Sequence, residues 1–197
     1  MRKASYDKAN KIYMTDSCPG EFDYGSLGVV DFDAVTKKYC AEKKLIATAH
    51  SNDALLCSRD GSAYVFVEFK NGKLVYERKK GDTIERRIND ETIAELREKI
   101  QESILIFLDI QDEKVSFARE NMEYILVYNI VNDPPTENEV CIERSVDKIH
   151  GALNRTSKNE FIRFGLRRFK GYLLKDVHTY TPSQFEAYMK NHIQPTA

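Results

Sequence analysis

Long apolar runs, paired cysteines and a surplus of charge of one sign are all missing from this sequence. No stretch approaches the roughly 18 apolar residues that cross a membrane, and the N-terminal segment has no apolar signal core. We therefore expect a cytoplasmic protein without a membrane partner. The formal net charge is only −1, so overall charge does not indicate nucleic-acid binding. Any such function must depend on the local distribution of charge.

Several common catalytic and metal-binding motifs are also absent. The 4 cysteines are far apart, without a Cys-x-x-Cys pair or a histidine cluster, which favours reduced structural thiols over a metal cluster. No Gly-x-Ser-x-Gly, P-loop or His-Glu-x-x-His motif is present, so a small-molecule hydrolase is a weak interpretation. With 42% hydrophobic and 31% charged residues, the 197-residue chain is typical of one globular domain, residues 1–197.

The most informative stretch runs from Asp53 to Lys70 and has the pattern of a β-hairpin. Two segments rich in aliphatic, β-branched and aromatic residues flank Asp60-Gly61, a pair suited to a type I′ turn. If that pair is a two-residue loop, facing residue numbers sum to 121, and Asp53 faces Glu68. Because side chains alternate along a strand, Lys70 projects from the same face as Glu68.

Two carboxylates and an ammonium are therefore expected at one strand end. Carboxylates directly opposite each other have Cβ atoms about 4.5–5.5 Å apart and repel, unless a cation offsets their charge. Hard oxygen ligands that leave room for water and phosphate suit Mg²⁺ or Mn²⁺ rather than zinc. The alternative is an ordinary hairpin whose rim charges form a surface ion pair.

Clear helix and strand patterns follow the hairpin. A long helix is predicted from a cap at Asn89 or Asp90, with apolar residues at three- and four-residue steps as far as Leu108. Residues 124–131 form a continuous apolar run, which predicts a central strand. Two further helices are expected, with caps at Asp31 or Asp33 and at Thr181.

Positive charge is concentrated in two segments. Residues 77–89 form a cation-rich connection, interpreted either as a solvated loop or as a nucleic-acid contact. Residues 145–175 interleave cations with aromatic residues, a pattern that suits a phosphate groove, although such aromatics are more often core. We expect this second segment to bind nucleic acid through Arg155, Arg163, Arg167, Arg168 and Lys170.

In this sequence an acid opens one strand, a Glu-x-Lys triplet ends its hairpin partner, and a long helix and another strand follow. This order resembles the PD-(D/E)XK nuclease superfamily. The resemblance covers residues 31–131 and leaves residues 140–197 as a basic C-terminal extension. It implies an α/β fold with a restriction-endonuclease-like mixed central sheet, a β-hairpin that carries the site, and flanking helices. It also implies that Asp53, Glu68 and the Phe69 carbonyl bind metal, and that Lys70 is the catalytic lysine.

The resemblance predicts an enzyme that hydrolyses nucleic-acid phosphodiesters with Mg²⁺ or Mn²⁺ as cofactor, with DNA favoured over RNA. Lys70 is expected to position the attacking water or to offset charge in the transition state. Glu42 is a candidate for a further acid, but an exposed, salt-bridging glutamate is the favoured interpretation. A homodimer is compatible with the sequence, which does not fix the oligomeric state. The competing hypothesis is a non-catalytic module with the same fold that binds nucleic acid or a partner protein.

Overall fold

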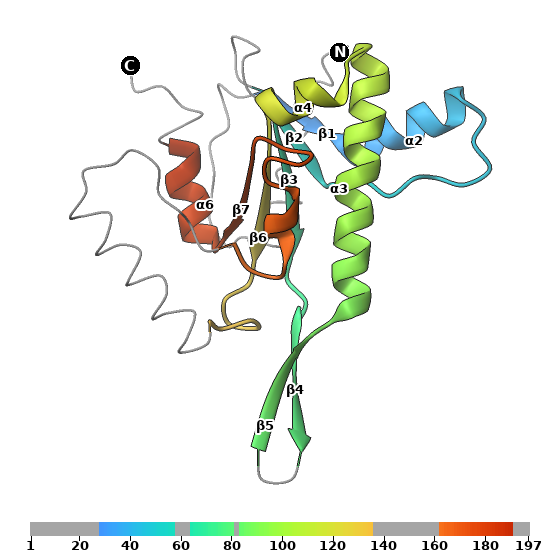
Figure 1. Cartoon of the computed structure of the whole chain (residues 1–197). Coiled ribbons are helices and arrows are strands. Elements are labelled where there is room, and N and C mark those ends of the chain that lie inside the picture. The colour runs from blue at the N-terminus through green and yellow to red at the C-terminus, as the bar shows by residue number, and fades with distance from the viewer. Residues whose placement is uncertain (1–27, 58–63, 81–82, 136–161, 191–197) are drawn as a thin grey trace.

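A mixed sheet lies at the centre of the structure, a computed structural model that describes residues 28–57, 64–80, 83–135 and 162–190 (Figure 1). Within these residues the sheet has five strands in the order β1-β2-β3-β6-β7. Neighbours β1, β2 and β3 are antiparallel, whereas β6 runs parallel to β3, and β7 parallel to β6. Their bounds are β1 (Gly28–Asp31), β2 (Ala54–Cys57), β3 (Tyr64–Lys70), β6 (Met122–Tyr128) and β7 (Asp176–Tyr180).

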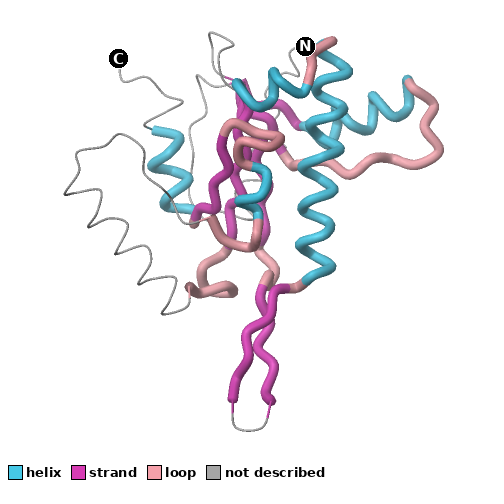
Figure 2. The backbone as a smooth tube through the Cα atoms, viewed as in Figure 1, coloured by secondary structure: helices cyan, strands magenta, loops and turns pink. Residues whose placement is uncertain are grey.

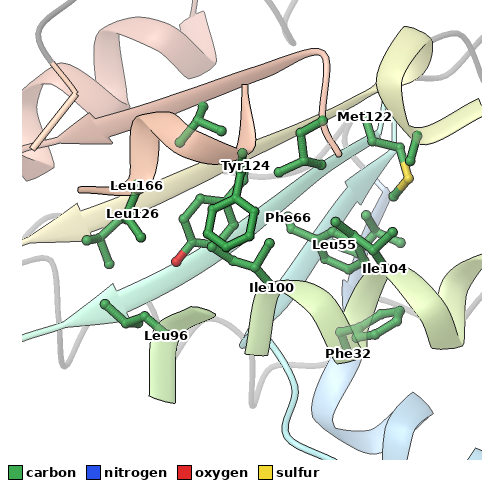
Figure 3. Packing of buried hydrophobic residues seen from close by; sticks show 14 of the residues in the cluster. Phe32, Leu55, Phe66, Leu96, Ile100, Ile104, Met122, Tyr124, Leu126 and Leu166 are labelled. Atoms are coloured by element: carbon green, nitrogen blue, oxygen red, sulfur yellow. The ribbon is translucent and has the colours of Figure 1, made fainter. Parts of the chain in front are cut away.

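Helices cover both faces of this sheet. One face carries α2 (Phe32–Glu42), the long α3 (Asp90–Gln111), α4 (Val115–Asn121) and the short 3-10 helix η1 (Leu166–Phe169). The other face carries α6 (Pro182–Tyr188). Figure 3 shows the larger of the two cores, where residues of α3, including Ile100, pack against Phe66 of β3 and Tyr124 of β6.

Helix caps lie where the sequence predicts them. Asp31 caps α2 and Asn89 caps α3, each accepting a hydrogen bond from a backbone N–H of the first turn, at 2.9 and 3.3 Å. Thr181 and Gln184 form the capping box of α6. The predicted apolar stripe of α3 is buried in the core and consists of Ile93, Leu96, Ile100, Ile104, Phe107 and Leu108.

The pairing of β2 with β3 confirms the predicted register. Leu55 pairs with Phe66, so the numbers of facing residues sum to 121. Both side chains lie in the core under α3, while their sequence neighbours in each strand face α6. Asp53 and Glu68 follow the same alternation and come to the α3 side of the sheet. The Asp60-Gly61 turn lies outside the described residues.

The cation-rich connection is the main departure from the sequence prediction. The described part of residues 77–88 forms strands rather than a loop, because β4 (Val75–Lys80) and β5 (Thr83–Ile88) pair as a second, two-stranded antiparallel sheet. This hairpin projects away from the body of the molecule (Figure 2). Strand β3 ends at Lys70, as the predicted hairpin does, and β6 ends at Tyr128, before the end of the predicted apolar run at residue 131. No helix in the described part of the chain is long and apolar enough to cross a membrane.

Candidate functional site

The three residues predicted to form a site, Asp53, Glu68 and Lys70, lie together on the sheet face that α3 covers. Glu68, at the end of β3, is 1% exposed, and Lys70 Nζ lies 3.8 Å from its Oε1. A lysine of α3 completes the group, because Lys99 Nζ is 2.7 Å from Glu68 Oε1 and 3.9 Å from Asp53 Oδ1. The two carboxylates therefore share one half-buried ammonium.

Backbone contacts on two sides hold Asp53 at the start of β2. Its Oδ2 accepts a hydrogen bond from the N–H of Phe69 in β3, at 2.8 Å. Its carbonyl accepts one from the N–H of Phe32 in α2, at 3.3 Å. Phe69 thus contributes to the site through its N–H, and the ligand role expected for its carbonyl stays a prediction.

The residues before Asp53 connect the site to both helices. Asn52 is fully buried, and its backbone N–H donates to Ser103 Oγ of α3 at 2.8 Å. Ser51 Oγ donates a hydrogen bond to Asp33 Oδ1 of α2. These contacts fix the segment that carries the first acid, so Asp53 is held by the fold rather than by a free loop.

Burial raises the pKa of both carboxylates. Burial and then the charge of Asp53 raise the pKa of Glu68 to about 8, against the opposing effect of the nearby lysines. The pKa of Asp53 is also raised, chiefly by burial. Burial lowers the pKa of Lys99, but the charges of the two acids outweigh it, and the net pKa of Lys99 is raised. The cluster therefore holds protons more tightly than its separate groups would in water.

The donor atoms of this cluster fit a small divalent cation. Glu68 Oε2 is buried and has no hydrogen-bond partner in the described structure, a costly arrangement unless a cation or water binds it. Mg²⁺ needs only one or two carboxylates, because it keeps several waters and binds substrate phosphate. Among the described residues, no group of three or more His, Cys, Asp or Glu side chains could hold a metal ion. The arrangement thus suits an open, two-carboxylate site.

Lys99 is the residue that the sequence analysis missed. Lys99 lies on the stripe of α3 that packs on the sheet. Three- and four-residue steps place it on one face of the helix with Leu96 and Ser103. The signal that could have identified Lys99 is a charged residue within the apolar stripe of a helix. This helix follows the two acids in the sequence. The same helix supplies Glu95, whose Oε1 lies 3.5 Å from Lys70 Nζ.

Arg163 does not have the exposed position expected of a phosphate contact. It is 4% exposed, and its guanidinium donates to the Asp133 carbonyl at 2.8 Å. The guanidinium also lies over the rings of Tyr128 and Phe164, at 4.8 and 4.7 Å from their centroids. This arginine is a buried structural cation, which corrects the prediction from the basic segment.

The other basic residues of that segment have varied surroundings. Arg167 and Arg168 are exposed on η1, as a nucleic-acid contact would require. Lys170 is paired with Asp176, with 2.7 Å between Lys170 Nζ and Asp176 Oδ1. Arg155 lies outside the described residues.

One smaller prediction is confirmed by the surroundings of Glu42. This residue is exposed on α2, with 3.8 Å between its Oε1 and Lys38 Nζ, which agrees with the favoured interpretation of a surface salt bridge. Cys40 and Cys57 are free thiols, while Cys18 and Cys141 lie outside the described residues.

Comparison of the chain with protein-family models, with curated proteins and with solved structures finds no match. What the site can do therefore follows from its own chemistry. It contains the buried carboxylate of Glu68, the half-buried carboxylate of Asp53 and two lysines, and Glu68 Oε2 has no partner among the described residues.

Proposed function

We propose that this protein is a metal-dependent nuclease that hydrolyses nucleic-acid phosphodiesters at the Asp53–Glu68–Lys70 cluster. The observation that carries the proposal is the buried Glu68 Oε2, which has no hydrogen-bond partner in the described structure. This oxygen lies in a cluster that also contains the carboxylate of Asp53. Other buried polar atoms of the described structure also lack a partner, including the Tyr124 hydroxyl, but Glu68 Oε2 is the one that belongs to a carboxylate beside a second carboxylate and two lysines. A divalent cation beside a phosphate is the ligand that two hard oxygen donors favour.

The order of the elements supports a restriction-endonuclease-like core related to the PD-(D/E)XK superfamily. Asp53 precedes β2, and Glu68 and Lys70 end its antiparallel neighbour β3. The chain then passes through α3 to β6, which is parallel to β3. The β4–β5 hairpin is inserted between β3 and α3. This order of strands and helix supports the proposed core, with the β4–β5 hairpin as an insertion.

Asp53 and Glu68 would hold Mg²⁺ or Mn²⁺, with the Phe69 carbonyl as a further expected ligand. When bound, such an ion lowers the pKa of the attacking water and offsets charge on the phosphate oxygens. Lys70 has donors but no acceptor, so its ammonium orients the water or offsets transition-state charge. Lys99 balances the two carboxylates in the absence of the ion and competes with it for the same oxygens.

A cleavage assay tests this proposal. Purified protein should cut DNA or RNA with Mg²⁺ or Mn²⁺, and Ca²⁺ should bind without supporting turnover. Glu68→Gln and Lys70→Ala should lower the rate by orders of magnitude, whereas Glu42→Gln, which changes an exposed acid, should keep the parent rate. Intact DNA and RNA panels at high protein concentration with either metal would remove the proposal, as would cleavage by Glu68→Gln at the parent rate.

A second candidate is a non-catalytic module with this fold, and one observation favours it. Lys99 and Lys70 already place two ammonium groups 2.7 and 3.8 Å from Glu68 Oε1, so the fold does not need a metal ion to balance the charge of the two acids. Thermal unfolding separates the two functions, because a ligand that binds only the folded state raises its stability. A nuclease site should show Mn²⁺ stabilisation that Asp53→Ala abolishes, and a binding module should show none.

A further inference from the structure

The hairpin formed by β4 and β5, called the arm below, is inserted between the two elements that carry the candidate site. It begins at Val75, five residues after Lys70 ends β3, and it finishes at Ile88, directly before the cap of α3. Lys99 lies in the third turn of that helix. The arm therefore leaves the body beside the end of β3, where the cluster lies, and extends past the end of α3 (Figures 1 and 2).

The base of the arm is held firmly by the body. Leu74 is fully buried, and both its N–H and that of Val75 donate to Oδ1 of the buried Asp133, at 2.8 and 2.9 Å. The Leu74 carbonyl accepts a hydrogen bond from the Asn89 N–H at 2.8 Å, which joins the two ends of the arm. Asn89 also donates from Nδ2 to the Tyr76 hydroxyl at 2.8 Å. These bonds fix the direction in which the arm projects.

Beyond Leu74 and Val75 at its base, no side chain of the arm that the structure describes belongs to either core. Its two strands form a sheet of their own, and an isolated two-stranded hairpin is at best marginally stable in water. Lys79 and Arg87 are exposed, and Tyr76 and Ile88 are 51% and 43% exposed. The arm therefore combines a fixed base with exposed positions among its described side chains.

The charge of the arm indicates what kind of partner fits it. The whole chain has a formal net charge of −1, yet the two strands of the arm carry five cations against two anions. Such a local excess complements a phosphate backbone. The cations are Arg78, Lys79, Lys80, Arg86 and Arg87, and the anions are Glu77 and Glu85.

We propose that the arm enters the major groove of double-stranded DNA and so makes duplex DNA the substrate class of the candidate site. The major groove of B-form DNA is about 12 Å wide and admits a two-stranded β-ribbon. Each strand of the arm has six residues, about 20 Å of length, enough to cross the groove. The major groove of A-form RNA is deep and too narrow to be read by side chains, so duplex RNA is excluded. The choice of substrate rests on the proposed nuclease function, whereas the binding itself does not.

A paired-variant binding experiment tests this inference. The arm variant is Lys79→Gln with Arg87→Gln, and the matched control is Lys37→Gln with Lys38→Gln on α2, which removes the same charge from exposed positions away from the arm. Affinity is measured by fluorescence anisotropy in Ca²⁺ at several salt concentrations, for a 30-base-pair DNA duplex, one of its single strands and the corresponding RNA duplex. Circular dichroism confirms that both variants are folded.

The parent should prefer the DNA duplex. The arm variant should bind that duplex roughly 10- to 60-fold more weakly at 0.1 M salt, with a logarithmic salt slope flatter by about 1.8 for two lost phosphate contacts. The control variant should match the parent. A DNA duplex with bulky substituents at the pyrimidine C5 positions, which face the major groove, should bind the parent poorly.

Parent-like affinity and salt slope in the arm variant would overturn the inference. So would equal parental affinity for the DNA duplex and either of the other nucleic acids, or undiminished binding of the C5-substituted duplex. A cleavage assay on the same proteins separates the two proposals. If the arm variant loses duplex binding but the parent never cuts, the arm assignment holds and the nuclease proposal fails. If the parent cuts and the arm variant cuts and binds equally well, the nuclease proposal holds and the arm assignment fails.

Discussion

Replacing Lys99 with methionine tests how strongly its half-buried ammonium stabilises the two carboxylates. Lys99 Nζ lies 2.7 Å from Glu68 Oε1 and 3.9 Å from Asp53 Oδ1, and its side chain is 15% exposed. Removing one partner of a buried ion pair leaves an uncompensated charge, which typically costs about 3–5 kcal/mol. Methionine keeps an unbranched side chain of similar length, so the change is mainly one of charge. We expect Lys99→Met to lower the free energy of unfolding by about that amount at pH 9.

The loss should depend on pH in a defined direction. With Lys99 present, burial and the charge of Asp53 already raise the pKa of Glu68 from 4.5 to about 8. Without the lysine, the pKa rises further, and the folded state then binds a proton that the unfolded state releases. A raised folded-state pKa gives stability that is lost as pH rises towards that pKa, so the loss should level off above about pH 8 in the parent and should continue through pH 9 in Lys99→Met.

A divalent ion should replace the missing ammonium. At a free concentration of about 100 Kd, Mn²⁺ adds about 2.7 kcal/mol to the stability of a state that binds it, so it should restore much of the loss. The parent should gain less at the same Mn²⁺ concentration, because Lys99 competes for the carboxylates.

Urea unfolding followed by circular dichroism at pH 6, 7.5 and 9, with and without Mn²⁺, measures both effects. Lys43→Met is the control, because Lys43 pairs with Asp109 at 2.8 Å on the surface, and its loss should have little effect at any pH. A loss below about 1 kcal/mol for Lys99→Met at pH 9 would refute the reasoning.

Three further substitutions give distinct expectations. Glu68→Gln should gain stability relative to the parent as pH rises from 5 to 9, by at most about 1.36 kcal/mol for each unit of raised pKa, because it has no buried carboxyl to ionise; parallel stability curves would contradict this. Tyr124→Phe removes a buried hydroxyl without a partner in the described structure, so thermal unfolding should show equal or higher stability, by up to about 1 kcal/mol. Arg163→Gln should destabilise the fold by about 2–4 kcal/mol, because it loses a buried hydrogen bond and two ring contacts. The salt slope of DNA binding should stay unchanged, because Arg163 is buried. A flatter slope would return Arg163 to the nucleic-acid interface.

The hairpin that carries Asp53 and Glu68 was predictable because the information is local. A two-residue turn signal between apolar segments fixes the register, and the register determines which side chains share a face. The pairing of Leu55 with Phe66 shows that the predicted register is correct. The long helix was predictable for the same reason, because its cap at Asn89 and its apolar stripe lie within one continuous segment.

Features that depend on distant segments were not predictable. Lys99 is 31 residues from Glu68 in the sequence, and only the packing of α3 on the sheet brings them together. Arg163 lies among aromatic residues in a pattern that suits an exposed or a buried cation equally, and it is the Asp133 carbonyl, 30 residues away, that decides between them.

The β4–β5 arm was missed for a different reason. Both of its strands are rich in charged residues, so they lack the apolar side chains by which strands are usually identified. The usable signal was the turn, since only Gly81-Asp82 separates Lys80 from its partner Thr83 in the sequence. Glycine followed by aspartate is typical of a two-residue hairpin loop.

The most direct test of the metal-dependent site is a crystal structure of the protein with Mn²⁺, using anomalous scattering to locate the ion. We expect a peak between the carboxylates of Asp53 and Glu68, with Lys99 displaced from Glu68 Oε1. No peak there at millimolar Mn²⁺, with Lys99 still within hydrogen-bond distance of Glu68, would contradict a metal-dependent nuclease and support the non-catalytic module.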